Sequence, residues 1–128
     1  DLNDEKEYPI NLKVPNGHTI CLPYLSALVR LADEIDITAS RNSKAIYDLN
    51  KIVKEIDLIE FMKHEAVHSL DITDKAFIMG IKSDDPKIIE GLNILAGKMK
   101  KTLDYCRSVV NNRTSFTITQ EDVIIKNL

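Results

Sequence analysis

The feature that most constrains this chain is a long apolar stripe in its C-terminal half. Apolar side chains recur there at steps of three and four residues, the spacing of one face of an α-helix. The stripe consists of Ile88, Leu92, Leu95, Met99, Leu103, Cys106 and Val110. The preceding "SDDP" predicts the start of the helix, because Ser83 or Asp84 suits the N-cap and Pro86 suits the first turn. We expect this face to pack within the domain rather than to form the seam of a coiled-coil dimer.

Shorter patterns predict two hairpins and further elements near the C-terminus. The first hairpin surrounds the turn-forming pair Asn16-Gly17 in "INLKVPNGHTICL", and the second joins "VHSLDI" to "AFIMGIK". "TSFTIT" is a further strand candidate. "TQED" is a capping-box pattern that predicts a short terminal helix from Gln120 to Asn127.

Two more helices are expected in the N-terminal half. Pro23 suits the first turn of a helix that runs to about Ile37. After "TASRNS", a second helix is expected to begin near Asn42 or Ser43 and to run to about Lys63. The expected fold class is α+β, mainly helical, with three principal helices and small β-hairpins, in a single domain over residues 1–128.

Composition and charge exclude several classes of function. The chain has 128 residues, of which 44% are hydrophobic and 29% charged, so a folded core is favoured over disorder. No apolar run approaches the ~18–20 residues needed to cross a bilayer. A net charge of −3 and the absence of tryptophan give no reason to expect nucleic acid as a partner. Lys98, Lys100 and Lys101 form a short basic cluster that we interpret as a solvated helix face.

The two cysteines, Cys21 and Cys106, lie in apolar surroundings far apart in the sequence. Neither belongs to a CxxC pair or has the spacing of metal ligands. We interpret them as free thiols in a reducing cytoplasm, with a structural disulfide as the alternative.

A zinc-peptidase motif occurs in "FMKHEAVHSLD", where His64, Glu65 and His68 have the order H-E-x-x-H. A peptidase needs both histidines on one continuous helix. His68, however, falls where the pattern has changed to strand alternation, and residues four apart in a strand are roughly 13 Å apart. We therefore interpret the motif as a helix-end His64 and a strand His68 that share no metal.

The segment "CLPYLSALVRLADEIDI" places carboxylates on an apolar helix face. Leu25, Leu28, Val29, Ala32 and Ile35 share one arc at about 100° per residue. Asp36 projects into the middle of this arc and Asp33 lies at its edge, whereas Glu34 is expected to be exposed. A carboxylate on such a face must be neutralised, hydrogen-bonded or metal-bound, because burying it unpaired is costly. A structural network with Arg30, Arg41 or backbone amides stays open beside a metal site.

The same segment resembles a known family. "LPYLSALVRLADEIDI", with Arg41 after it, is similar to the late metal-ligand helix of HD-superfamily phosphohydrolases, where a pattern of the type L-x-A-L-x-R-L-A-D-x-L-D recurs. That family holds its metal with an early His, a His-Asp doublet and a late Asp. The resemblance makes Asp33 the counterpart of the late metal ligand, and gives supporting or phosphate-contacting roles to Arg30, Asp36 and Arg41. It implies hydrolysis of nucleotides or other phosphate esters, assisted by Mn, Mg, Fe or a similar divalent ion.

The chain departs from the family in its remaining ligands. No His-Asp doublet occurs in the 128 residues, and His18 is the only His before Asp33. One carboxylate cannot hold a catalytic cation alone, so we assign no catalytic residue and expect no divalent metal to bind this chain tightly. The resemblance implies that the chain is the C-terminal part of a larger HD-type protein, whose upstream part is its partner and carries the missing ligands.

Other functions stay open at this point. A non-catalytic regulatory or protein-interaction module could keep the same scaffold, and an H-E-x-x-H zinc peptidase is the third reading. A homodimer is an alternative use of the apolar helix faces. Neither a membrane nor a nucleic acid is expected as a partner.

Overall fold

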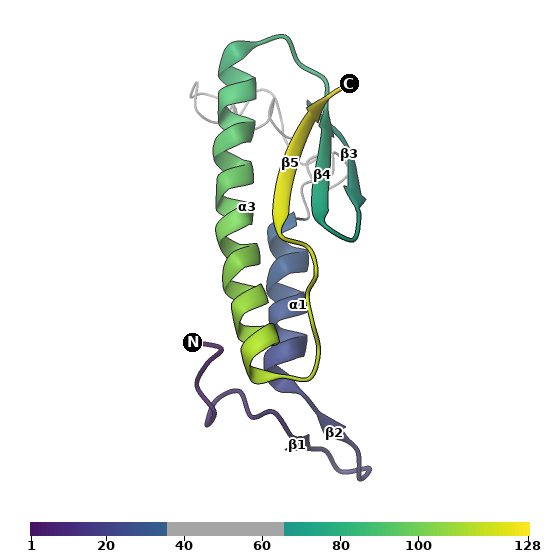
Figure 1. The fold of residues 1–128 in the computed structure, drawn as a ribbon, viewed down its shortest axis with the longest axis vertical. Coiled ribbons are helices and arrows are strands. Elements are labelled where there is room, and N and C mark those ends of the chain that lie inside the picture. Colours follow the sequence, from purple (N-terminus) through teal and green to yellow (C-terminus); the bar gives the residue numbers. More distant parts are fainter. Residues whose placement is uncertain (36–65) are drawn as a thin grey trace, which may run out of the picture.

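The computed structural model describes residues 1–35 and 66–128, and it shows an α+β fold. The described elements, in chain order, are β1 (Leu12–Lys13), β2 (Thr19–Ile20), α1 (Leu22–Ile35), β3 (Val67–Ile72), β4 (Ala76–Ile81), α3 (Pro86–Arg113) and β5 (Asp122–Asn127). Helix α3 is the longest element, with α1 and the sheet of β3, β4 and β5 beside it, and the β1–β2 hairpin extends beyond its C-terminal end (Figure 1).

Helix α3 begins as its sequence predicts and buries the predicted stripe. Asp85 is the N-cap, one residue after the predicted position, and its carboxylate accepts a hydrogen bond of 2.9 Å from the Lys87 amide. Pro86 occupies the first helical position, where its missing N–H would have had no partner inside the helix. Six stripe residues are buried, and Leu95 is partly buried. The first half of the stripe packs on the sheet and the second half on α1, so the stripe is covered within the domain.

The sheet has the order β3-β4-β5, and β5 corrects the predicted terminal helix. Strands β3 and β4 form the predicted antiparallel hairpin, whereas β5 pairs in parallel with β4, Ala76 opposite Asp122. The run from Val123 to Ile125 is β-branched throughout, which suits a strand better than a helix. Parallel pairing with β4 therefore overrides the local capping-box pattern, which predicted a helix. The predicted strand "TSFTIT" is also wrong, because residues 114–119 form an irregular connection.

Helix α1 lies beside α3 and runs in the opposite direction (Figure 1). The face of α1 that is buried differs from the predicted face. Its buried residues are Pro23, Ala27 and Leu31. The predicted arc is instead largely open: the exposed fractions are 46% for Leu25, 39% for Leu28 and 69% for Val29. Apolar residues occupy two sides of this helix, and α3 packs against the side where the small Ala27 permits close approach.

The predicted count of three principal helices is wrong for residues 1–35 and 66–128, which contain two, α1 and α3. The helix expected from Asn42 or Ser43 to Lys63 falls outside the described residues. Within those same ranges there are five strands in two sheets, so this part of the chain has more strand than expected. The first predicted hairpin is confirmed as β1 and β2, with Gly17 at a φ of 84° in its turn, a conformation that favours glycine.

The N-terminal segment is fastened to the C-terminal half of α3. Leu2 is 1% exposed and belongs to the same core cluster as Leu103 and Val110. Arg113, in the last turn of α3, donates hydrogen bonds to the carbonyl oxygens of Leu2 and Tyr8 and forms an ion pair with Glu5. These contacts bring residues 1–8 beside α1, where they help to form the pocket described next.

No helix in the described ranges is both long enough and apolar enough to span a membrane.

Candidate functional site

A pocket of about 530 Å³ lies between α1 and the N-terminal segment. Its lining residues are Leu2, Tyr8, Leu22, Leu25, Ser26, Val29, Arg30 and Asp33. The volume falls in the range of small-molecule sites in proteins. One wall is apolar, and the polar groups gather where α1 carries Ser26, Arg30 and Asp33 at helical spacing. The pocket therefore offers a cation, a carboxylate and a hydroxyl beside an apolar surface.

Asp33 lies in the last turn of α1, on the rim of this pocket, and its side chain is exposed. Within the part of the chain that the structure describes, its carboxylate has no hydrogen bond and no ion pair. Its neighbour Glu34 is partly buried, so the expectation that Glu34 is exposed is wrong. Asp36 and Arg41, the other two residues of the predicted site on this segment, lie outside the described residues.

Arg30 also lines the pocket, and its guanidinium is directed toward α3. The guanidinium carbon lies 5.1 Å from the ring centroid of Tyr105, which is a cation–π geometry. Among the described residues Arg30 forms no ion pair, although Asp33 is three residues away on the same helix.

Tyr105 is itself held by the N-terminus of the chain. Its hydroxyl accepts a hydrogen bond of 2.8 Å from the Leu2 amide and donates one of 2.8 Å to the Asp1 carboxylate. Sequence reasoning missed both Leu2 and Tyr105 as parts of this site. No local pattern could have indicated them, because the contact joins residues that are 103 positions apart.

Cys106 lies beneath this region and is buried, whereas Cys21 is partly buried; both are free thiols, as predicted. Burial raises the pKa of the Cys106 thiol, and the positive charge of Arg30 lowers it by a smaller amount. The net direction is upward, so this thiol is protonated and unreactive near neutral pH.

A metal site is not complete in the described residues. Nowhere in residues 1–35 and 66–128 do three or more His, Cys, Asp or Glu side chains gather closely enough to hold a metal ion. Asp33 offers one hard oxygen ligand of the kind that Mg²⁺ and Mn²⁺ prefer. Alone, it does not fit the needs of a catalytic cation.

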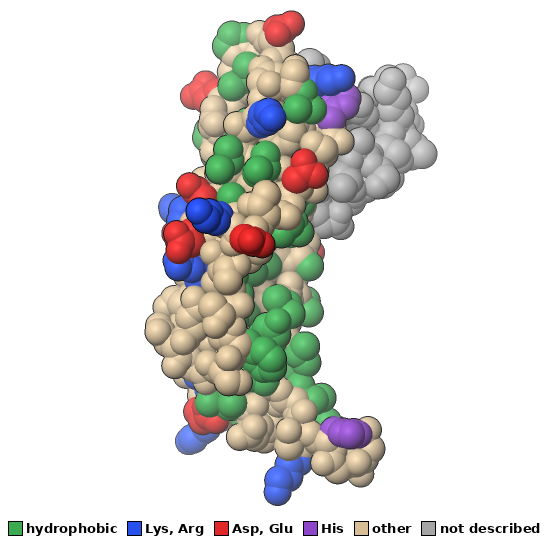
Figure 2. Space-filling view, turned by 45° about the vertical axis from the view of Figure 1, so that its right-hand side comes forward, with side chains coloured by type: hydrophobic (Ala, Val, Ile, Leu, Met, Phe, Trp, Pro, Cys, Tyr) green, Lys and Arg blue, Asp and Glu red, His purple; other side chains and the backbone are tan. Residues whose placement is uncertain are grey.

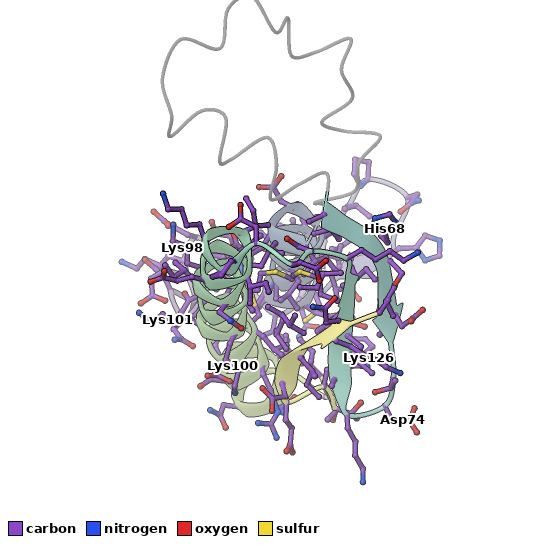
Figure 3. The ribbon with its side chains drawn as sticks, turned by 90° about the horizontal axis from the view of Figure 1, so that it is seen from above. His68, Asp74, Lys98, Lys100, Lys101 and Lys126 are labelled. Atoms are coloured by element: carbon purple, nitrogen blue, oxygen red, sulfur yellow. The ribbon has the colours of Figure 1, made fainter. Side chains whose placement is uncertain are left out.

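The H-E-x-x-H motif does not form a helix through its second histidine. Strand β3 begins at Val67, so His68 lies in a strand, as predicted, and it is exposed. Figure 3 shows His68 projecting outward from β3, on the far side of the sheet from α3. His64 and Glu65 lie outside the described residues. Strand geometry at His68 removes the continuous helix that a zinc peptidase requires.

The lysine cluster remains a helix-surface feature. Lys98 and Lys101 are exposed and Lys100 is partly buried (Figure 3). Lys100 forms a 2.6 Å ion pair with Asp104, one turn along α3. An exposed pair of this kind indicates a solvated face.

The outer surface of α1 is apolar next to the pocket. Leu25, Leu28 and Val29 are exposed there, and we call them the outer α1 surface. In Figure 2, hydrophobic side chains gather at the level where Figure 1 shows α1. Asp33 is one helical turn from Val29, so the carboxylate borders this surface.

Comparison with known sequences gives one result. The sequence model of the HD-CE family matches residues 1–114, which includes α1, Asp33 and the whole of α3. A search of curated proteins and a search of solved structures returned no match.

Proposed function

We propose that the chain is part of a metal-dependent phosphohydrolase acting on nucleotides or other phosphate esters. The proposal starts from the family match, because the chain belongs to the HD-CE family. In this proposal Asp33 supplies one oxygen ligand to a divalent cation, and Arg30 contacts the phosphate of the substrate. Asp36 and Arg41 keep the supporting roles that their sequence positions suggest.

The observation that carries the proposal is the state of Asp33. Its carboxylate stands on the rim of a pocket of about 530 Å³, and it has no partner among the described residues. Asp33 is exposed, so water can solvate its carboxylate, and no protein group has to be displaced before a cation binds. Arg30 is close along the helix and is turned to Tyr105 instead. An available carboxylate beside an available guanidinium suits a site that receives a cation and a phosphate together.

The residues present do not complete the metal site, and the proposal assigns the missing ligands to another part of the protein. The expected ligands are an early His and a His-Asp doublet, and the 128 residues contain no such doublet. When bound, the cation would polarise the phosphate and lower the pKa of an attacking water. The residues of this chain would bind and orient the substrate: Arg30 at its phosphate, and Leu22 and Val29 along its organic part.

The outer α1 surface supports a neighbour at this position. Leu25, Leu28 and Val29 expose apolar side chains next to Asp33, and a cluster of this kind favours contact with another protein segment. We assign the part of this surface outside the pocket, around Leu28, to the upstream part of the same protein. A helix packed there would place its own side chains within reach of Asp33 and would limit the entry of water into the pocket.

A non-catalytic interaction module is the second candidate. The observation that favours it is the absence of a His-Asp doublet from the sequence together with the open outer α1 surface. In that case the fold keeps the scaffold and uses the surface to hold a protein partner.

The test compares the 128-residue chain with the protein encoded by its native open reading frame. The chain alone should bind Mn²⁺ with the weak affinity of a surface carboxylate in calorimetric titration, and should not hydrolyse phosphate esters. The longer protein should bind Mn²⁺ tightly and turn over a phosphate ester, and Asp33→Ala should abolish both. Glu65→Gln serves as the matched control and should leave both unchanged.

Two results would overturn the proposal. One is tight metal binding with turnover by the 128-residue chain alone, because the ligand set would then lie elsewhere. The other is an open reading frame without a His-Asp doublet and a protein without turnover, which would establish the non-catalytic candidate.

A further inference from the structure

Arg30 and Asp33 carry opposite charges three residues apart on one helix, and yet they are not paired. Residues at this spacing are neighbours on a helix surface, and an arginine and an aspartate there normally attract each other. In the described structure no ion pair joins them, and both side chains line the same pocket. Both residues are exposed, and the attraction at this spacing is weak, so one competing contact is enough to hold Arg30 away from Asp33.

Tyr105 provides that contact. The guanidinium of Arg30 lies 5.1 Å from its ring centroid, on the α3 side of the helix. The ring cannot follow Arg30 toward the pocket rim, because its hydroxyl is fixed by the Leu2 amide and the Asp1 carboxylate. The cation–π contact satisfies the guanidinium without neutralising it, so its positive charge stays available to an anion.

We propose that Tyr105 is a positioning residue of this pocket, which keeps Arg30 separate from Asp33 so that the two can bind a phosphate and a cation at the same time. The inference rests on the proposed function for the role of Asp33. The binding of phosphate by Arg30 needs no metal and is measured independently.

The pocket also points to the class of ligand. Leu22, Leu25 and Val29 form an apolar wall on the same helix as Arg30, and Leu2 and Tyr8 close the opposite side. A ligand that fits these groups carries its phosphate at Arg30 and a planar or apolar organic group along the wall. The ligand class is therefore a phosphate monoester with a sizeable organic group, rather than inorganic phosphate.

The test is an NMR titration of the whole chain in the presence of EDTA, with inorganic phosphate and with adenosine monophosphate as probes. Both should shift the signals of α1 residues, and the monophosphate should bind at least several-fold more tightly. Arg30→Gln should abolish both shifts. Equal affinity of the two probes would overturn the assigned ligand class, and unchanged binding in Arg30→Gln would overturn the anion site.

The role of Tyr105 is tested by a rescue that a merely structural residue would not permit. Tyr105→Leu removes the ring, so Arg30 can pair with Asp33, and monophosphate affinity should fall about two- to fivefold, the range of an exposed ion pair or cation–π contact. Adding Asp33→Asn removes the competing carboxylate and should restore the lost affinity. Tyr105→Phe keeps the ring but removes the hydroxyl that fixes it, so its affinity should lie between those of the parent and of Tyr105→Leu.

The comparison needs two controls. Asp33→Asn alone measures the general gain from removing a negative charge, and the gain should be larger in the Tyr105→Leu background. Circular dichroism checks that each variant is folded at the temperature of titration. Equal gains from Asp33→Asn in both backgrounds would refute the positioning role.

The outcome is separable from that of the proposed function. A protein without catalytic activity can still bind phosphate at Arg30 and show the rescue by Asp33→Asn in the Tyr105→Leu background. That result would support this inference without supporting the proposed function. Conversely, metal-dependent turnover that is lost in Asp33→Ala can occur while Tyr105→Leu leaves ligand binding unchanged, and that result would overturn this inference alone. Unchanged binding in Arg30→Gln would overturn this inference and the phosphate contact proposed for Arg30, but not the role of Asp33 as a metal ligand.

Discussion

Replacing Arg113 by methionine should detach the N-terminal segment from α3. The arginine side chain is 14% exposed and donates to the carbonyl oxygens of Leu2 and Tyr8. Methionine keeps the apolar stem and removes the charge and the donors. The change therefore isolates the polar contacts that hold residues 1–8 in place.

The expected loss is about 2–4 kcal/mol in the free energy of unfolding. Each hydrogen bond from a charged donor contributes roughly 1.5–3 kcal/mol, and this is reduced when the freed carbonyl can reach water. Leu2 is 1% exposed, and releasing such a side chain costs about 1.5–3 kcal/mol. The ion pair with Glu5 adds little, because the Glu5 side chain is 64% exposed.

Urea unfolding followed by circular dichroism measures the loss, and amide hydrogen exchange locates it. The Leu2 amide, which donates to the Tyr105 hydroxyl, should exchange much faster in Arg113→Met than in the parent. Glu5→Gln is the matched control and should change the free energy of unfolding by less than about 1 kcal/mol. An Arg113→Met protein within about 0.5 kcal/mol of the parent, with Leu2 still protected, would refute the reasoning.

Two further predictions concern the core. Leu103→Ala should lower the free energy of unfolding by about 2–5 kcal/mol, because Leu103 is fully buried. The same change at Leu25, which is 46% exposed, should lower it by less than about 1 kcal/mol. Equal losses in urea titrations would contradict the assignment of the buried faces. Burial raises the pKa of the Cys106 thiol above its ordinary 9.0, so above that pH the unfolded chain releases a proton that the folded chain keeps, and stability falls as pH rises. Urea titrations at pH 8 and 10 should show a larger loss in the parent than in Cys106→Ala, and an equal loss would contradict the prediction.

The elements that sequence predicted well are those with a strong local signal. The stripe on α3 repeats over its whole length, and only one face can be covered, so the buried face followed from spacing alone. The β3–β4 hairpin was predictable for the same reason, since its two strands are neighbours in the chain.

The errors occurred where distant residues decide. For α1, apolar residues lie on two sides of the helix, and packing against α3 buried the side that carries Ala27 and Leu31. For β5, the capping pattern before Asp122 favoured a helix, and pairing with β4 overrode it. Asp33 was predicted as a site residue from a resemblance in its own segment, and that role stays a prediction. Tyr105 contacts Arg30 only through the packing of α3 on α1, which no local pattern records.

The parallel pairing of β4 with β5 has a consequence for the order in which the molecule assembles. Strand β4 and its neighbour β3 are joined by a tight turn, so their hairpin closes with little loss of chain entropy. Strand β5 cannot reach β4 until the 28 residues of α3 have folded and residues 114–121 have returned the chain to the sheet, because both segments lie between the two strands. We therefore expect the nucleus of folding to consist of the hairpin and the first half of α3, with β5 added late. The side of β4 that β5 later covers would be exposed in the meantime, so a chain that is still folding could pair this edge with a strand of another molecule.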